Sequence, residues 1–574
     1  MTVISEPKPR RRYGDAWTAS AVDFATGTHA RAVAFLVAAA LLAFLAGFFH
    51  IPPVDRDEAR FAQATKQMIE TGDFVDIRFQ DETRYKKPVG TYWLQAAAVE
   101  LAEAAGLPRA RFRIWLYRIP SLFGAIGVVL GTYWAALAFV SRRAAFLAGL
   151  IMATSILLGV EARLAKTDAV LTFTVVAAMG AMARAYLAGQ GERGIDIHPL
   201  ATAAIFWTAL AVGILIKGPL IVMIAGLAIV ALALADRSAA WLLRLRPAIG
   251  AIFVLALVLP WFVAIILKSG DSFFVEAIGN DLLAKVESGQ ESHGVPPGFY
   301  FVLFWVTFFP GAMLAGLAAP AVWRARSDPG AKFLLAWLVP SWIVFELVPT
   351  KLPHYVLPLY PAIAILIVGV IDSGSLSRNR WLERGTMWWF ILAAGAGLGL
   401  IALNAFIGAR LGLPSWAFAA AAAILALFAW TLYRVDGPEA ALVRAAAASI
   451  MLSIAAYALT FAKIGGLFPA VPLADYVRST ECAYPSTITA GYHEPSLVFL
   501  AGTELKHGDG ASAAEFLNGG SCRFALIERG EERSFSQRAD ALGLRYSSGP
   551  RVEGYNISGG RPVFIRTYRS ERSQ

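Results

Sequence analysis

Charge is what this 574-residue chain has least of. Only 16% of its residues are Asp, Glu, Lys or Arg, and 57% are hydrophobic, whereas a soluble domain carries about 25% charged residues. This scarcity excludes an ordinary soluble protein. The net charge of +10 comes from Lys and Arg residues scattered over short loops, without the basic stripe that nucleic-acid binding requires. Nucleic acid is therefore not an expected partner.

Cysteine is also scarce, and no histidine motif typical of a metal site is present. Cys482 and Cys522 are the two cysteines, and they are either two buried thiols or, in an oxidising compartment, a disulfide. His293 and His354 fall in loops without a close HxxH or HExxH spacing, so solvated histidines are favoured over a metal site. We therefore expect no required cofactor, and a divalent metal remains the alternative, with its ligands unknown.

Long apolar runs are what the chain has in abundance. Each run of about 20 residues can cross ~30 Å of hydrocarbon as a helix, which indicates a polytopic α-helical membrane protein. The first run follows Lys8 and Arg10 to Arg12 and is too long for a signal peptide, so it is interpreted as a retained anchor. We predict about thirteen spans, near residues 31–49, 117–139, 144–160, 169–188, 200–216, 219–235, 248–267, 299–321, 332–348, 355–371, 386–406, 415–433 and 441–463.

The basic loops predict the topology. If the N-terminus is cytoplasmic, the short loops richest in Arg and Lys all fall on the cytoplasmic side, as the positive-inside rule requires. The expected domains are a cytoplasmic basic N-terminus (1–30), a transmembrane catalytic domain (31–465) whose first external loop covers 50–116, and an external C-terminal domain (466–574). A bacterial inner membrane is the expected location, with that last domain in the periplasm.

The last ~110 residues have the size and polarity of one small soluble domain. We predict an α/β or α+β module, and in an oxidising periplasm a Cys482–Cys522 disulfide would stabilise it. Nothing in it resembles a catalytic constellation. Strands are expected at Thr487–Ala490, Leu497–Leu500, Arg523–Ile527 and Pro562–Tyr568, with helices near Ser512–Leu517 and Ser534–Leu542.

The first external loop is unusually rich in ionisable residues. Apolar positions at helical spacing predict an amphipathic helix over Arg56–Glu70, lying on the membrane surface and ending at Gly72. Pro88 opens a second helix that runs to about Ala105. A charged segment held at a bilayer surface in this way is a candidate catalytic loop.

Carboxylates from two segments are candidates for the chemistry. Asp57 and Glu58 open the surface helix, where they could also simply stabilise its N-terminus. Asp168 lies at the external end of another span, where a carboxylate beside hydrocarbon is costly and usually functional. Asp57 and Asp168 could therefore flank one reacting centre.

Several cations belong to the same external face: Arg60, Lys86, Lys87, Lys166, Lys217 and Lys351. Lysine at a helix end often only extends its ammonium group to the membrane surface. A group of such cations at bilayer depth is, however, what the phosphate or pyrophosphate of a lipid would need.

These residues stand in motifs that resemble a known family. The chain is similar to the aminoarabinose lipid A transferases and the related protein O-mannosyltransferases, in the same order and over most of the membrane region. The matching motifs are Asp57-Glu58-Ala59-Arg60-Phe61-Ala62, Gly72-Asp73, Tyr85-Lys86-Lys87-Pro88, Tyr92-Trp93-Leu94, Thr167-Asp168, Lys217-Gly218-Pro219 and Lys351-Leu352-Pro353-His354-Tyr355-Val356-Leu357-Pro358.

The resemblance implies a GT-C glycosyltransferase that uses a polyprenyl-phosphate-linked sugar. Asp57 and Asp168 match the family's catalytic acids. The donor phosphate is expected on Arg60, Lys87 and Lys217. The substrate pocket is expected to include Glu58, Tyr85, Lys86, Lys351, His354, Tyr355 and His293.

Three departures from the family leave the sugar and the acceptor unassigned. Phe61 stands where a tyrosine is usual, and Lys86 stands where a glutamate is usual. The histidine expected after the seventh span is absent from Glu276–Asp281. Lipid A or lipopolysaccharide, another glycolipid and a protein all remain as acceptors.

As a mechanism, Asp57 would act as general base on an acceptor hydroxyl while cations stabilise the leaving phosphate. Attack opposite the leaving group predicts inversion at the sugar. The rival interpretation is a lipid or sugar transporter or flippase, but such proteins commonly show inverted repeats, which are not evident here. A structural assembly protein would leave the acids and external cations unexplained.

Overall fold

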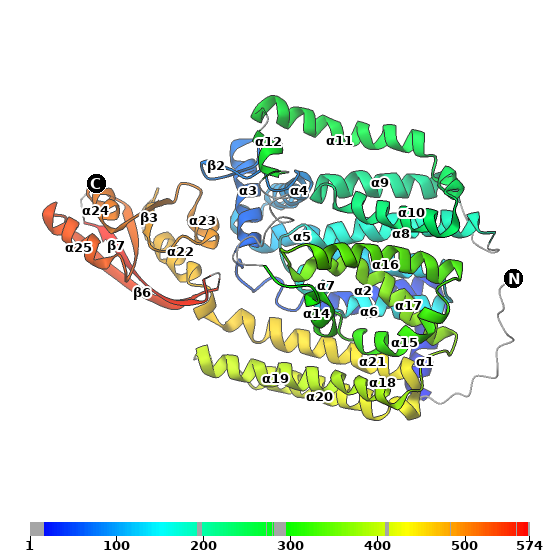
Figure 1. Cartoon of the computed structure of the whole chain (residues 1–574). Coiled ribbons are helices and arrows are strands. Elements are labelled where there is room, and N and C mark those ends of the chain that lie inside the picture. Colours follow the sequence, from blue (N-terminus) through cyan, green and yellow to red (C-terminus); the bar gives the residue numbers. More distant parts are fainter. Residues whose placement is uncertain are drawn as a thin grey trace.

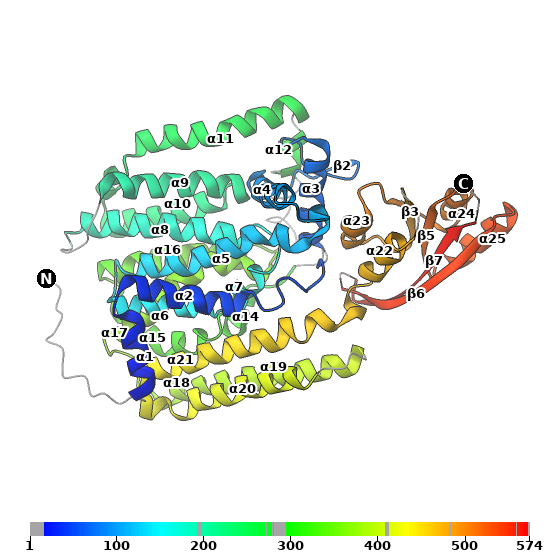
Figure 2. The same ribbon diagram turned by 180° about the vertical axis from the view of Figure 1, so that it is seen from behind.

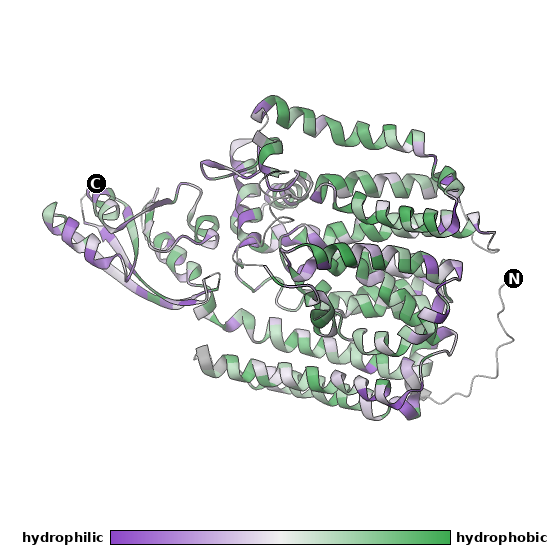
Figure 3. Cartoon of the chain, viewed as in Figure 1, coloured by the Kyte–Doolittle hydropathy of each residue, from purple (hydrophilic) through white to green (hydrophobic). Residues whose placement is uncertain are grey.

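The computed structural model describes residues 16–54, 56–191, 198–270, 272–277, 279, 294–407, 412–480, 482, 484–557 and 559–571. Most of them form a bundle of long helices, and a small domain with a β-sheet projects from one end of it (Figure 1). The bundle is mainly hydrophobic, whereas the small domain and the loops facing it are more polar (Figure 3). The fold is therefore that of a polytopic membrane protein with a C-terminal α/β domain, as predicted.

The bundle contains sixteen helices of the described part, several of them bent or short. They are α1 (Ala16–Thr26), α2 (His29–Phe44), α5 (Ile114–Ala136), α6 (Arg142–Ala153), α7 (Ile156–Glu161), α8 (Asp168–Gly189), α9 (Pro199–Lys217), α10 (Leu220–Asp236), α11 (Pro247–Ser269), α14 (Phe299–Thr307), α15 (Ala312–Arg324), α16 (Pro329–Leu347), α17 (Tyr360–Asp372), α19 (Trp388–Ile407), α20 (Leu413–Thr431) and α21 (Tyr433–Ser453). Shorter elements connect them, among them η2 (Ala240–Leu245), α12 (Ser272–Phe274), η5 (Pro353–Leu359), α18 (Arg380–Arg384), η6 (Gly385–Met387), η7 (Ile454–Ala458), η8 (Phe461–Lys463) and η9 (Gly465–Leu467).

Each of the predicted spans contains at least one helix. Among the described residues, nine helices are long and apolar enough to cross a membrane, or up to eleven if each of two bent pairs is one span, and α10 is shorter. The predicted span at 144–160 is divided into α6 and α7. Multiple membrane crossings are therefore confirmed, although several spans are not single straight helices.

Helix α1 lies across the end of the bundle opposite the small domain (Figure 2). It is bent by 115° from α2, and its Trp17 and Phe24 side chains are exposed. Large exposed aromatic residues at a span end are typical of the interface between hydrocarbon and water.

The first external loop forms α3 (Asp57–Thr71), a short hairpin of β1 (Arg78–Phe79) and β2 (Glu82–Thr83), α4 (Gly90–Ala104) and the single turn η1 (Ala110–Phe112). Gly72 ends α3 with a positive φ of 72°, a conformation that glycine adopts without strain. The helix predicted over Arg56–Glu70 and its end at Gly72 are confirmed, but α3 is covered by protein on more than one side. Even its polar Gln63 and Lys66 are buried, because α4 packs on one side and the C-terminal domain on another.

The C-terminal domain contains α22 (Ala470–Arg478), β3 (Ser486–Ala490), α23 (Pro495–Ala501), β4 (Lys506–Gly508), α24 (Gly510–Asn518), β5 (Arg523–Glu528), α25 (Glu532–Ala541), β6 (Tyr546–Asn556) and β7 (Arg561–Ser570). Its strands form one sheet in the order β4-β3-β5-β7-β6. The pairs β3–β4 and β3–β5 are parallel, with Ser486 opposite Arg523, whereas β5–β7 and β6–β7 are antiparallel.

Alternation along β5 explains the layers of this domain. Side chains two residues apart share one face of a strand. Ala525 and Ile527 pack with α24 and α25, whereas Phe524 and Leu526 pack with α22 and α23, in a core that continues into α3 and α4. The sheet is therefore covered on both faces, and one cover joins it to the first external loop.

Two sequence expectations for this domain have different outcomes. The strand expected at Leu497–Leu500 is wrong: these residues lie in α23, which starts at Pro495 and is buried between the sheet and α3. A continuous apolar run has no periodicity that separates a buried strand from a buried helix. The structure contains a disulfide between Cys482 and Cys522, which lie just before β3 and β5.

Candidate active site

The candidate site lies where the first external loop meets the ends of α7, α8, α9 and η5. Asp168 is the first residue of α8, and Lys217 is the last residue of α9. Helices α8 and α9 pack along their length, and η5 contacts both α7 and α8. Residues far apart in the sequence are therefore brought to the same end of the bundle, the end that carries the C-terminal domain (Figure 1).

Asp168 is the centre of a buried ionic cluster. Its carboxylate accepts a hydrogen bond from the Lys217 ammonium. Lys166 Nζ lies 3.8 Å from Asp168 Oδ2, and His354 Nε2 lies 3.7 Å from Oδ1. Because Asp168 is only 3% exposed, the two ammonium groups and the imidazole compensate for the water that the carboxylate has lost.

Glu161 completes this cluster from the end of α7. It is also 3% exposed, and its Oε1 lies 3.4 Å from Lys166 Nζ and 3.6 Å from His354 Nδ1. Lys166 and His354 therefore stand between two carboxylates. The second carboxylate oxygen of Glu161, Oε2, is buried and has no hydrogen-bond partner among the described residues.

A divalent metal is a poor fit to this arrangement. Glu161, Asp168 and His354 do place one donor atom each within 4.8 Å of one another, a set that could ligate a cation. However, Lys166 and Lys217 already neutralise the two carboxylates. A further charge of +2 in this buried space would be uncompensated, which is unfavourable at low dielectric.

Asp57 contrasts with Asp168. It lies at the start of α3, is exposed, and forms no hydrogen bond or ion pair with any described residue, so it does not cap its own helix. Its charge nevertheless acts on Lys166 and on Tyr92 of α4, which places it beside the buried cluster. Asp57 is therefore the carboxylate that a substrate can reach.

Arg60 follows Asp57 by nearly one helical turn. It is half-buried, and its side chain also forms no hydrogen bond or ion pair within the described part of the chain. Residues three apart lie on the same face of a helix, so Arg60 and Asp57 both face the site. An acidic and a basic side chain, neither with a partner among the described residues, thus lie on one face of α3.

Glu58 was expected in the substrate pocket, but the structure gives it a different role. It is 1% exposed and pairs with Arg118 of α5, with Arg118 Nε 2.7 Å from Glu58 Oε1. The same carboxylate accepts hydrogen bonds from the backbone N–H groups of Val54 (2.8 Å) and Ala165 (2.9 Å). Glu58 therefore fixes the start of α3 against the segment that carries Lys166 and Asp168.

Two other residues expected in the pocket are also occupied in packing. The Tyr85 hydroxyl donates to Asp76 Oδ1 at 2.7 Å, and its ring contacts Phe273; burial and the Asp76 carboxylate raise the pKa of Tyr85. Lys351 is 3% exposed, and its ammonium donates to the carbonyls of Val295 (2.9 Å) and Val348 (2.7 Å). Neither polar group is directed at Asp168.

The remaining predicted residues lie at the rim of the site or outside the described residues. The Lys217 ammonium is 5.4 Å from the centroid of the Tyr355 ring, a cation–π contact. Lys87 Nζ donates to the carbonyl of Lys86 at 2.8 Å, and Lys86 is exposed and near Glu276, whose pKa is raised by burial. His293 lies outside the described residues.

Sequence reasoning did not select Glu161 or Arg118, and it included Lys166 only among the external cations. Glu161 and Lys166 flank the Thr167-Asp168 motif, and acidic or basic residues next to hydrocarbon are the usual signal of function. Arg118 lies within a predicted span at 117–139, where the same signal applied.

The chain is similar in sequence to known glycosyltransferases. Residues 34–269 match the family model described as dolichyl-phosphate-mannose-protein mannosyltransferase. The chain is 27% identical over 384 residues to the undecaprenyl phosphate-alpha-4-amino-4-deoxy-L-arabinose arabinosyl transferase of Aeromonas salmonicida, and 26% identical over 388 residues to that of Erwinia tasmaniensis. The matches cover 63% and 66% of this chain but only 66% and 62% of those relatives.

Solved structures extend the similarity to nearly the whole chain. The crystal structure of ArnT from Cupriavidus metallidurans in the apo state has a TM-score of 0.72 with this chain at 19% identity, covering 93% of this chain and 97% of that one. The same protein bound to undecaprenyl phosphate has a TM-score of 0.70. The predicted GT-C fold is therefore confirmed, as is the similarity to the aminoarabinose transferase and mannosyltransferase superfamily.

Proposed function

We propose that this chain is a membrane glycosyltransferase that moves a sugar from a polyprenyl-phosphate donor to an acceptor on the external face of the membrane. One observation carries this proposal: Asp57 and Arg60, an acid and a cation that are not fully buried, lie near the buried lysines that Asp168 holds. The GT-C fold and the names of the relatives support the same chemistry.

The donor phosphate is assigned to the space between Arg60, Lys87 and Lys217. A sugar phosphodiester carries one negative charge, and its leaving phosphate gains a second as the sugar departs. Cations fixed near that phosphate stabilise the transition state more than the ground state. Asp168 acts through Lys217 and Lys166: it holds their ammonium groups in place, so that the leaving group needs no proton.

Asp57 is assigned as the base that takes the proton of an acceptor hydroxyl. A base must reach the proton that it removes and must not be neutralised beforehand; Asp57 meets both conditions, and Asp168 meets neither. If the acceptor is instead an ionised phosphate, Asp57 orients it or stabilises the positive charge that develops on the sugar. Attack on the side opposite the leaving phosphate inverts the sugar carbon.

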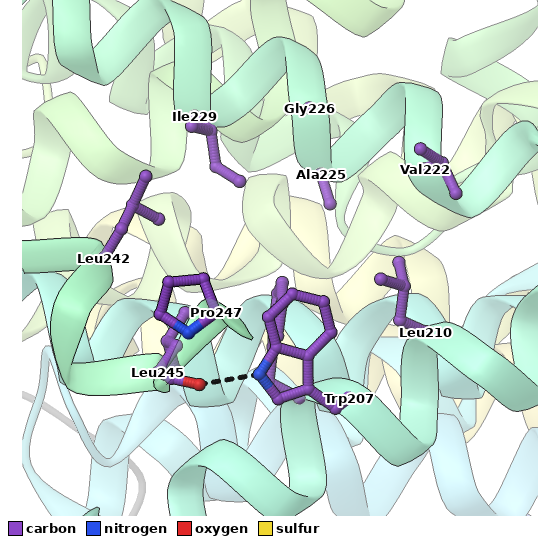
Figure 4. A pocket seen from close by; sticks show the side chains of 10 residues that line it. Trp207, Leu210, Val222, Ala225, Gly226, Ile229, Leu242, Leu245 and Pro247 are labelled. Atoms are coloured by element: carbon purple, nitrogen blue, oxygen red, sulfur yellow. Dashed lines mark hydrogen bonds between the residues drawn. The ribbon is translucent and has the colours of Figure 1, made fainter. Parts of the chain in front are cut away.

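An apolar cavity supports a lipid-linked donor. It has a volume of about 230 Å³ and lies between α9, α10, η2 and the start of α11 (Figure 4). Leu210 on its wall is seven residues before Lys217 on α9, a distance of roughly 10 Å at 1.5 Å per residue. We assign part of the prenyl chain to this cavity. It is lined by Phe206, Trp207, Leu210, Val222, Ala225, Gly226, Ile229, Leu242, Leu245 and Pro247.

Orientation and location follow from the same proposal. The Cys482–Cys522 disulfide and the basic loops at the opposite end favour a C-terminal domain in an oxidising periplasm and a cytoplasmic N-terminus. The acceptor is then lipid A or lipopolysaccharide, another glycolipid, or a protein that reaches this face.

The test is donor consumption by the purified protein in detergent, where transport has no meaning. The donors to compare are undecaprenyl phosphate linked to 4-amino-4-deoxy-L-arabinose and polyprenyl phosphate linked to mannose, each with lipid A and with envelope extract as acceptors. Release of the free polyprenyl phosphate by wild type, and its loss in Asp57→Asn, is the expected result. Binding of every donor without release would contradict the proposal. A parallel assay with a metal chelator measures whether a divalent metal contributes.

A further inference from the structure

Arg84 is a buried arginine in the first external loop without a carboxylate partner. It lies between β2 and α4, is 8% exposed, and forms no ion pair with any described residue. Its guanidinium carbon is 5.2 Å from the centroid of the Phe61 ring, and Phe61 follows Arg60 directly in α3. The Glu276 carboxylate interacts electrostatically with Arg84 but forms no ion pair with it. A buried guanidinium without a close counter-charge is unfavourable, so this position needs an explanation.

Tyr92 of α4 stands on the other side of Phe61. The two rings are 5.2 Å apart between centroids, and the charge of Arg84 opposes the rise in the Tyr92 pKa that burial causes. The Arg84 guanidinium is close enough to the Tyr92 hydroxyl to donate to its oxygen, but the Arg84 Nε–H and the Tyr92 O–H proton have no acceptor among the described residues, although such buried donors are nearly always paired.

The chemistry of these two groups identifies what would pair them. Arg84 Nε–H is only a donor, and the Tyr92 O–H can donate as well, so the missing partner must accept hydrogen bonds. A guanidinium also favours an anion with more than one oxygen. Asp57 acts electrostatically on Tyr92, so this pair lies on the Asp57 side of the site.

Two other cations of the site already have partners within the protein. Lys217 is paired with Asp168, and Lys351 is bound to backbone carbonyls. We propose that Arg84 and Tyr92 form a second half of the donor-phosphate site, opposite Lys217 and next to Arg60, and that they bind the non-bridging oxygens of the polyprenyl phosphate. This inference rests on the proposed function and adds two binding residues to it.

The test measures lipid phosphate binding separately from turnover. Purified wild type and Arg84→Gln are titrated with undecaprenyl phosphate and with the uncharged undecaprenol in the same detergent. Arg84→Gln should weaken binding of the phosphate about tenfold and leave binding of the alcohol unchanged. Arg84→Lys should recover part of the affinity, because it keeps the charge without the guanidinium fork. Arg78→Gln is the matched control, since Arg78 is an arginine of the same hairpin that pairs with Asp76.

Tyr92→Phe keeps the ring packing and removes only the hydroxyl. It should weaken binding of the phosphate by about threefold and provides the test if Arg84→Gln does not fold. Unchanged affinity for undecaprenyl phosphate in Tyr92→Phe and in a folded Arg84→Gln, or an equal loss of affinity for undecaprenol, would overturn this inference. Failure of wild type itself to bind the phosphate or to release it from a donor would instead overturn the proposed function.

Discussion

Arg118 holds Glu58 with two hydrogen bonds, from Nε to Oε1 at 2.7 Å and from Nη2 to Oε2 at 2.9 Å, and both residues are almost completely buried. The remaining N–H groups of Arg118 donate to the carbonyls of Phe48, Ile51 and Pro52 at 2.8–3.0 Å. A guanidinium has five donors, and all of them are used. This pair therefore joins α5, the end of the first span region and the catalytic helix α3.

Glu58→Gln should destabilise the protein strongly. It removes the charge that compensates the buried Arg118, and breaking a buried ion pair costs about 3–5 kcal/mol. Thermal unfolding in detergent, followed by loss of the monodisperse peak, measures this. Glu103→Gln is the control, because Glu103 forms an exposed pair with Arg111 that is worth about 0–1 kcal/mol. Equal unfolding temperatures for the two variants would contradict the role assigned to Glu58.

Asp57→Asn should abolish turnover without affecting folding. Loss of a general base lowers the rate by about 10²–10⁴-fold, whereas the exposed Asp57 side chain has no partner to lose in the described structure. The single-turnover rate and the affinity for the donor should be measured together, and only the rate should fall. Asp81→Asn, at another exposed aspartate of the same loop, should leave both unchanged. A normal rate in Asp57→Asn would show that another group takes the proton.

Asp168 and Lys217 should behave as one unit. Asp168→Asn leaves two buried ammonium groups undercompensated, and Lys217→Met leaves the carboxylate with fewer partners, so each should unfold more readily than wild type. Residues in contact show coupling energies of about 0.5–3 kcal/mol. The double variant should therefore be less destabilised than the sum of the single changes. Additive effects on the unfolding temperature would mean that the pair is not coupled.

Filling the apolar cavity should discriminate between donors by chain length. Gly226 lies on the cavity wall and a Cβ there would meet nothing within 4 Å, so Gly226→Phe is the variant chosen to fill the cavity. We expect a higher KM, by about tenfold, for a long-chain polyprenyl donor and little change for a short-chain analogue. Gly399→Phe, at another glycine of the bundle with free space around it, is the control. Equal KM changes for both donors would place the prenyl chain elsewhere.

The contact between α3 and the C-terminal domain should become more stable at alkaline pH. Lys66 donates to the carbonyl of Phe499 at 3.3 Å, lies 4.2 Å from the Phe112 ring centroid, and has a pKa lowered by burial from 10.5 to about 8. Between these two values the unfolded chain binds the proton and the folded chain does not, so the free energy of unfolding rises with pH. Unfolding temperatures between pH 8 and 10 measure this slope.

Lys66→Met is the comparison for that measurement. It removes the titrating group and should flatten the pH dependence while keeping the docking surface apolar. The nearby Glu70, 3.7 Å from Lys66 Nζ, is unchanged in this variant. The same slope in wild type and in Lys66→Met would assign the pH dependence to other groups.

The sequence by itself determined the membrane fold and the position of the loop that carries the candidate residues. A span must satisfy its own backbone hydrogen bonds within the hydrocarbon, so each span leaves a local signal of apolar length that needs no knowledge of its neighbours. Charges next to such runs are equally visible, which is why Asp57, Arg60, Asp168 and Lys217 could be selected as candidates from the printed residues alone.

Only the tertiary structure decided what each of these charges does. Asp57 and Asp168 are the same residue type at the start of two helices, yet Lys217, Lys166 and His354 surround only Asp168. The burial of Lys66 depends on α23, more than 400 residues away in the sequence. The ionic partner and the exposure of a side chain depend on segments that meet only in the folded chain, and no local pattern encodes them.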